Sequence, residues 1–151
     1  MSLIEEVGTG LDGLEQLKAL MQSQRKPGIL CSLDFDFVEV EAGRAVFAGR
    51  PGEHAYNPLG TVHGGYAATL LDSACGCAVH SQLTAAQAYT TLDLSVCYHR
   101  AITSETGLLR AEGRVRSLGR RVAFAEAQLT GSDGRLYASA TSTLLVFDRK
   151  S

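Results

Sequence analysis

The chain has 151 residues, of which 45% are hydrophobic and 20% charged, and its formal net charge is -2. This length suits one compact domain, and the composition is that of an ordinary soluble globular protein. The nearly balanced charge argues against a nucleic-acid-binding surface. There is no apolar run of about 18 residues and no basic-then-apolar signal peptide in "MSLIEEVGTG", so we expect a cytoplasmic protein with no membrane partner.

Four cysteines are scattered along the chain: Cys31, Cys75, Cys77 and Cys97. None forms a CxxC pair, and no set of Cys and His has the spacing of a zinc site. We therefore expect small, buried, reduced thiols and no metal site.

The N-terminal stretch "LDGLEQLKALMQ" places apolar residues at three- and four-residue steps: Leu11, Leu14, Leu17 and Met21. This spacing predicts a short amphipathic helix that ends at Pro27-Gly28. We treat residues 1–28 as an N-terminal helical segment and residues 29–151 as a single domain. The next stretch, "LCSLDFDFVEVEAGRAVFAGRP", alternates apolar and polar residues and predicts a hairpin that turns at Ala42-Gly43.

One long helix is predicted from His63 to about Ser81, and it is apolar nearly all round, which is typical of a buried helix. Four alternating runs follow and predict strands: "YTTLDLSVCYHR", "GLLRAEGRVRS", "RVAFAEAQLT" and "RLYASATSTLLVF". This order favours an α+β fold in which one antiparallel sheet wraps one central helix, and disfavours an alternating βαβ fold.

The start of the long helix carries two glycines, Gly64 and Gly65. The first amides of a helix lack intrahelical partners, and the helix dipole makes this end partly positive. Without side chains in the way, a ligand oxygen can approach these N–H groups, as in an oxyanion hole. The alternative is that the two glycines only permit tight packing or a sharp entry turn.

The long helix also carries one carboxylate, Asp72, among apolar neighbours. Nine residues separate it from His63, so the two side chains point to opposite sides of the helix, roughly 13 Å apart along its axis. Across a two-fold axis, Asp72 of one subunit can instead face the His63-Gly64 end of its partner, which favours a symmetric dimer with shared sites. The alternative is a structural Asp on a partly buried helix. Asn57 can likewise be only a turn former, and His63 only a helix-entry side chain.

The spacing Asn57-x5-His63-Gly64-Gly65-x6-Asp72 resembles the signature of hotdog-fold acyl-CoA thioesterases of the PaaI-like and 4-hydroxybenzoyl-CoA type II group. The resemblance covers roughly Gly49 to Phe147. It implies a hotdog fold and the hydrolysis of an acyl-CoA to a free acid and CoA.

The resemblance also implies a role for each motif residue. Asp72 is the catalytic carboxylate, either as general base or as nucleophile, and the Gly64 N–H polarises the thioester oxygen. His63 orients the substrate or steadies the Gly64 peptide, and Asn57 helps to place the nucleophile. Thr91 matches a residue that contacts the catalytic region, although Thr90 is an alternative in that register.

Substrate-binding residues are expected at two further places. Gly65 and Tyr66 lie beside the predicted oxyanion donor, and Arg116, Arg120 and Arg121 form a basic cluster next to a Gly turn. We expect this cluster to bind the nucleotide end of CoA, the alternative being a solvated group of charges. An Asp instead of a Glu as the acid favours the PaaI-like branch but does not fix the acyl group. The expected pocket residues of the helix are small or apolar and suit a small aromatic or medium-chain acyl group: Tyr66, Ala67, Leu70 and Ala74.

The implied reaction needs no metal and no cofactor, because a thioester is already activated. The implied assembly is a homodimer or homotetramer with shared active sites. Two other functions remain open from the sequence: a non-catalytic acyl-CoA-binding hotdog module and an acyl-carrier-protein thioesterase. A hotdog dehydratase is disfavoured by the pattern of Asn57 and Asp72.

Overall fold

The computed structural model of the chain describes residues 1–150. Its helices are α1 (Leu3–Gly8), α2 (Gly13–Gln22), α3 (Gly28–Leu33), the 3-10 turn η1 (Glu53–Ala55) and α4 (Gly64–His80). Its strands are β1 (Phe35–Glu41), β2 (Arg44–Gly49), β3 (Gln87–Tyr98), β4 (Leu109–Leu118), β5 (Val122–Gly131) and β6 (Leu136–Asp148).

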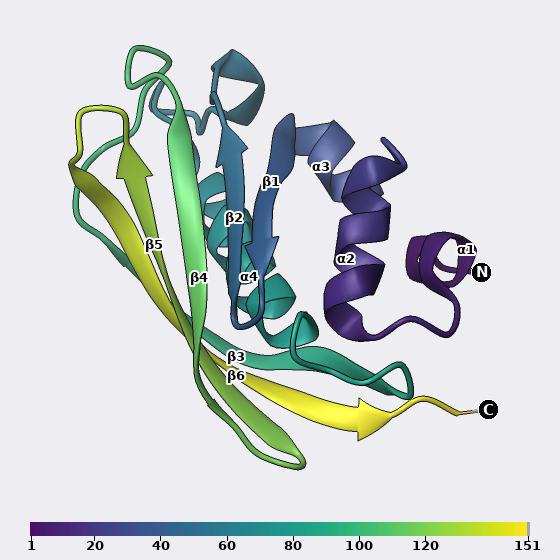
Figure 1. Cartoon of the computed structure of the whole chain (residues 1–151). Helices are drawn as coiled ribbons and strands as arrows, with labels where there is room; N and C mark the ends of the chain where they lie inside the picture. The colour runs from purple at the N-terminus through teal and green to yellow at the C-terminus, as the bar shows by residue number, and fades with distance from the viewer. Residues whose placement is uncertain (151) are drawn as a thin grey trace.

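The six strands form one antiparallel sheet in the order β1-β2-β4-β5-β6-β3, which curves around α4 (Figure 1). The core lies between α4 and the concave face of the sheet, where alternate strand residues such as Leu109 and Ala111 are fully buried. The polar residues between them, such as Arg110, face solvent. The predicted α+β fold, with its hairpin and its long central helix, is confirmed.

The central helix contacts the sheet through its backbone. A Cβ atom built at Gly113 of β4 would lie 2.3 Å from the carbonyl oxygen of Ala74 and 2.8 Å from the backbone nitrogen of Cys75. At the end of the helix, the hydroxyl of Ser81 accepts a hydrogen bond of 2.8 Å from the N–H of Gly43, in the β1–β2 turn. Only glycine at position 113 lets strand and helix approach this closely.

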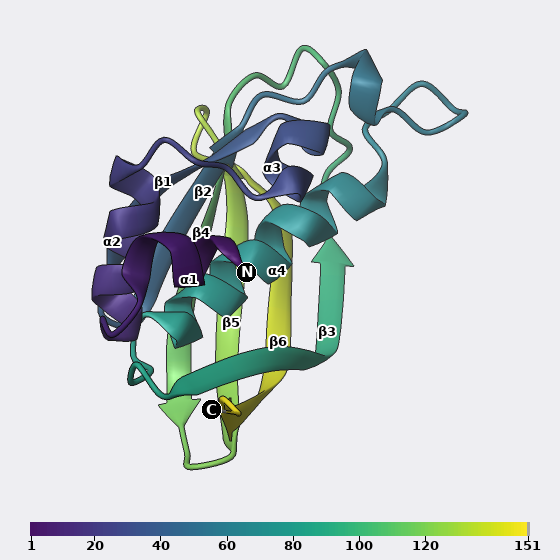
Figure 2. The ribbon, with the colours of Figure 1, turned by 90° about the vertical axis from the view of Figure 1, so that its right-hand side faces the viewer.

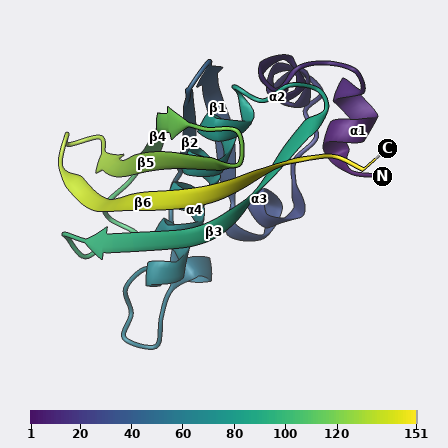
Figure 3. The ribbon, with the colours of Figure 1, turned by 90° about the horizontal axis from the view of Figure 1, so that it is seen from below.

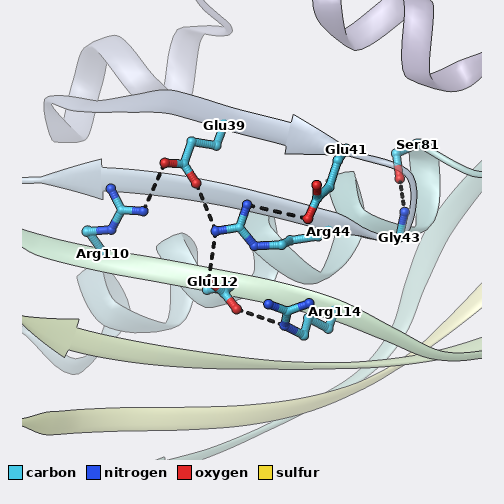
Figure 4. A network of polar contacts seen from close by, with 8 residues as sticks. All are labelled: Glu39, Glu41, Gly43, Arg44, Ser81, Arg110, Glu112 and Arg114. Atoms are coloured by element: carbon cyan, nitrogen blue, oxygen red, sulfur yellow. Dashed lines mark hydrogen bonds and ion pairs between the residues drawn. The ribbon is translucent and has the colours of Figure 1, made fainter.

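The solvent face of β1, β2 and β4 carries a network of ion pairs around Arg44 (Figure 4). The guanidinium of Arg44 lies 2.8 Å from Glu39, 3.0 Å from Glu112 and 3.7 Å from Glu41. Hydrogen bonds from Arg44 and Arg110 hold the pKa of Glu39 below its usual range. The network joins three neighbouring strands, so it supports their register more than any single exposed pair would.

The strand β3 forms one edge of the sheet, next to β6 (Figure 3). Its outer edge therefore has backbone groups with no strand partner in the single chain. A bulge interrupts its pairing with β6 between Thr91 and Asp93. The inserted residue, Leu92, is exposed, and a bulge of this kind turns the neighbouring side chains to a new direction.

The part of the chain before β1 contains two short helices, α1 and α3, that the apolar spacing did not predict. The helix α3 includes residues 30–33, which the sequence had assigned to the hairpin, so the first strand of the hairpin begins only at Phe35. Each of the two helices has only six residues, too few for a periodic pattern, and α1 begins at a capping box formed by Ser2 and Glu5. The predicted amphipathic helix is confirmed as α2. All three helices lie on the side of the sheet that carries α4 (Figures 1 and 2).

The helix α2 is fixed to the C-terminal end of α4 by two contacts. The N–H of Gly13 donates to the carbonyl of Leu83 at 2.9 Å, and a Cβ built at Gly13 would overlap the carbonyl oxygen of His80. The buried side chains of Gln16 and His80 are hydrogen-bonded at 2.8 Å. Burial, with a smaller contribution from Arg149, lowers the pKa of His80 to about 4.

The cysteines differ from the expectation of four buried thiols. All four are free, but Cys31 and Cys97 are exposed and only Cys75 is fully buried. The expectation is wrong for Cys31 and Cys97 because a cysteine's chemistry does not reveal which face of its helix or strand it occupies.

None of the helices in residues 1–150 has the length and hydropathy that a membrane crossing requires.

The close approach at Gly113 yields a prediction about stability. Gly113→Ala forces the backbones of β4 and α4 apart, and we expect it to lower the free energy of unfolding by about 3 kcal/mol. Gly28→Ala is the control, because a Cβ atom there meets nothing within 4 Å. Chemical denaturation measures both, and equal stabilities of the two variants would contradict the packing described.

The buried His80 yields a prediction about pH. Its pKa falls from 6.5 to about 4 on folding, so the unfolded chain binds a proton more readily in this range. Stability should therefore decrease as the pH falls from 6.5 towards 4, by about 3 kcal/mol from this residue. His80→Gln removes the titrating group. Between pH 6.5 and 4, the free energy of unfolding of this variant should therefore fall by about 3 kcal/mol less than that of the wild type. An equally steep loss in the variant would refute the assignment.

Candidate active site

Asp72 and Thr91 come together from α4 and β3. The hydroxyl of Thr91 donates a hydrogen bond of 3.0 Å to Oδ1 of Asp72. Thr91 is the last residue before the bulge of β3, and its side chain turns towards the helix. Thr90 is exposed, so Thr91 is the threonine that contacts Asp72.

A cavity of about 470 Å³ opens beside Asp72. We call it the acid-side cavity. Its lining is largely apolar and includes Leu20, Met21, Ile29, Leu30, Phe37 and Phe47. Two carboxylates reach it. Asp36 is paired with Lys26, whereas no cation within residues 1–150 forms an ion pair with Asp72.

Two titratable side chains next to Asp72 have pKa values that burial shifts. Burial, and to a lesser degree the charge of Asp72, raises the pKa of the Cys77 thiol to about 12. Burial also raises the pKa of the Tyr89 phenol well above its usual range. Both groups line the cavity and stay protonated at neutral pH. Cys77 is therefore no thiolate nucleophile.

The start of α4 is organised by His63. Its Nδ1 atom accepts a hydrogen bond of 2.8 Å from the N–H of Gly65, so the side chain caps its own helix. The carbonyl of Gly64 accepts a bond of 2.7 Å from the hydroxyl of Tyr98. The N–H of Gly64 donates to no acceptor within the described part of the chain, which leaves it available to a ligand.

A second cavity, of about 370 Å³, lies at this helix end, and we call it the amide-side cavity. His63 and Gly64 line it together with Tyr98, His99 and Arg100 from the end of β3. The sequence did not point to these last three residues, because nothing in the run "CYHR" shows that the strand ends beside the start of α4.

The two cavities are separate within one chain. No residue lines both, and Asp72 follows Gly64 by eight residues, or about 12 Å along a helix. The acid and the free amide therefore cannot act on the same carbonyl carbon in a single chain.

Asn57 and Tyr66 make contacts away from Asp72. The side-chain amide of Asn57 donates to Thr61 at 2.9 Å, and its oxygen accepts from the N–H of Leu59, so it closes the loop before α4. This loop projects from the body of the molecule (Figure 2), with Leu59 90% exposed at its tip. Tyr66 is 2% exposed in the core, and burial raises its pKa to about 12.

The three arginines of the predicted basic cluster lie apart from both cavities. Arg116 is paired with Glu126 at 2.7 Å on the solvent face of the sheet. Arg120 and Arg121 lie at the β4–β5 turn, beside a third cavity that β6 also lines. Within residues 1–150, no three His, Cys, Asp or Glu side chains are placed to hold a metal ion.

Comparisons with solved structures give the same fold. A thioesterase from Haemophilus influenzae has a TM-score of 0.77 at 19% identity, over 89% of this chain and 90% of its own. The E. coli PaaI protein of the phenylacetic acid degradation operon has a TM-score of 0.77 at 19% identity, over 89% and 94%. The Streptococcus mutans protein smu.793, solved with acetyl CoA, has a TM-score of 0.69 at 27% identity, over 78% and 91%.

Comparisons of sequence place the chain in a family. No curated protein matches it significantly. The thioesterase superfamily matches residues 59–138, just over half of the chain, and this stretch contains the start of α4, Asp72 and Thr91. With the hotdog fold and the motif that runs along α4, the match shows that this chain belongs to the thioesterase superfamily.

Proposed function

We propose that the protein is an acyl-CoA thioesterase that releases a free acid and CoA, with each active site shared between two subunits. The observation that carries the proposal is Asp72, a carboxylate at the wall of an apolar cavity whose side chain is held by Thr91 and by no cation. The acetyl CoA bound to the S. mutans relative supports CoA as the carrier. A module that only binds its ligand has no need of such an acid.

The chemistry follows from the two halves of the site. As a general base, Asp72 takes a proton from water while the water oxygen bonds to the thioester carbon. As a nucleophile, its own oxygen forms that bond, and water then cleaves the resulting anhydride. In both routes the carbonyl oxygen gains negative charge, which the Gly64 N–H stabilises. The C–S bond then breaks, and the CoA thiolate leaves and gains a proton.

A second subunit supplies the missing half of each site. The unpaired edge of β3 can pair with the same strand of a partner around a two-fold axis. The partner's amide-side cavity would then face the Asp72 of the first subunit. Arg100 lies in the amide-side cavity, where its guanidinium suits a phosphate of CoA. A homotetramer would contain two such dimers.

Replacement of the acid tests the catalytic assignment. We expect Asp72→Asn to lower kcat by at least about 100-fold, because the amide can neither accept the proton nor attack the carbon. Thiol release from a panel of acyl-CoAs measures this loss. Glu15→Gln, an exposed acid on α2 that lines neither cavity, is the control and should retain wild-type activity. Near-wild-type turnover by Asp72→Asn would refute the role of Asp72.

Removal of the amide tests the oxyanion donor. Gly64 is the first residue of α4, where proline is well tolerated, and His63 has the extended backbone (φ -58, ψ 137) that precedes proline readily. Gly64→Pro should therefore keep the fold but lower kcat by about 100-fold or more. Gly64→Ala places a Cβ atom at the same position and keeps the N–H, so it should remain far more active. Equal activities of the two variants would exclude the Gly64 N–H.

Mixing the two inactive variants tests the shared site. When Asp72→Asn and Gly64→Pro subunits are unfolded and refolded together, half of the dimers are mixed and each has one complete site. We expect about a quarter of the wild-type activity. Refolded samples of each variant alone are the controls. No recovery in mixtures shown by size measurement to be dimers would place the whole site in one chain.

A further inference from the structure

The acid-side cavity is built mainly by a part of the chain that the family match does not include. Of its sixteen lining residues, only five (Asp72, Ser73, Cys77, Tyr89 and Thr91) lie within residues 59–138. The others come from α2, the loop after it, α3, β1 and β2. The stretch that matches the family thus forms the wall that carries Asp72 and Thr91. The N-terminal helices of this chain form much of the rest of the lining.

The chemistry of the lining selects for an uncharged occupant. Aliphatic and aromatic side chains cover most of it, and its two cations are both paired. Arg25 lies 3.0 Å from Glu6, and Lys26 is paired with Asp36. A carboxylate carried into this cavity would lose its water without gaining a cation, which is costly.

The position of α2 is set by backbone contacts, so this wall is a fixed one. The contacts of Gly13 and Gln16 with the end of α4, described above, hold α2 against the central helix. About one turn after Gln16 on α2, the side chains of Leu20 and Met21 line the cavity. Because the helix is held in place, the size of these side chains determines how far a ligand can extend from Asp72.

We propose that the acid-side cavity is the acyl pocket, that it takes an uncharged medium-length aliphatic acyl group, and that Met21 limits the length of the chain. The proposal rests on the proposed thioesterase function and names its substrate class. The volume of about 470 Å³ lies in the range of small-molecule sites. The proposed pocket is thus formed largely by the N-terminal helices and not by Tyr66, which is buried in the core.

The test is a chain-length profile of kcat/KM, from acetyl-CoA to dodecanoyl-CoA. For the wild type, kcat/KM should rise about fourfold for each added methylene until the pocket is full. Met21→Trp fills the pocket, so the optimum should move to shorter chains, with a loss of at least about tenfold for the longest good substrate. Gln22→Trp places the same side chain on the neighbouring exposed position and should keep the wild-type profile.

A second pair of substrates tests the preference for uncharged groups. Adipyl-CoA differs from hexanoyl-CoA by a terminal carboxylate in place of a methyl group, and it should be hydrolysed at least about tenfold less efficiently. Adipyl-CoA as the better substrate would overturn the proposal, as would a Met21→Trp profile that keeps the wild-type optimum.

Binding of uncharged primary alcohols separates the pocket from the reaction. Calorimetry with alcohols of the same chain lengths needs no turnover. If the protein hydrolyses no acyl-CoA, the proposed function fails, but a length optimum in binding that shifts in Met21→Trp would still support the pocket. If hydrolysis occurs and neither profile responds to Met21→Trp, the pocket assignment fails and the thioesterase function stands.

Discussion

The burial of α4 is the constraint on which the rest of the structure depends. A helix that is apolar on nearly all sides must be covered on all sides. The curved sheet covers one side of α4 through β2, β3, β4, β5 and β6, and the backbones of strand and helix approach closely at Gly113. The N-terminal helices lie on the same side of the sheet as α4, and α2 contacts its C-terminal end. The acid-side cavity lies beside the helix, and Asp72 is the carboxylate of α4 that lines it.

The same helix explains why one chain carries two incomplete sites. Its first amide, at Gly64, and its carboxylate, at Asp72, lie more than two turns apart and line separate cavities. In the proposed dimer, two-fold pairing of the exposed β3 edge would bring the halves of two chains together without moving either helix. In this arrangement catalysis depends on assembly, because a carboxylate without an oxyanion donor supplies only part of the stabilisation that the transition state needs.

Two different parts of the chain form the walls of the acid-side cavity. The stretch that matches the family contains the helix start, the acid and its threonine, which are the groups that the proposed reaction uses. The segment before it contains most of the apolar lining. If this cavity is the acyl pocket as proposed, changes in α2 and α3 would alter the acyl group that is accepted while the chemistry stays the same. The ion pairs of Arg25 and Lys26 leave the lining without an unpaired positive charge.

The sequence by itself determined the central helix, the hairpin, the four later strands and the wrapped α+β sheet, because these depend on periodicities of 3.6 and 2 that can be read along the chain. The motif on α4 likewise indicated the family. The helices α1 and α3 were missed because six residues hold less than two turns of any pattern. The core position of Tyr66 and the choice of Thr91 over Thr90 were decided only by tertiary structure. A hydrogen-bond partner, a cavity wall or a bulge depends on which distant segments meet, and that information is not carried by any local stretch of sequence.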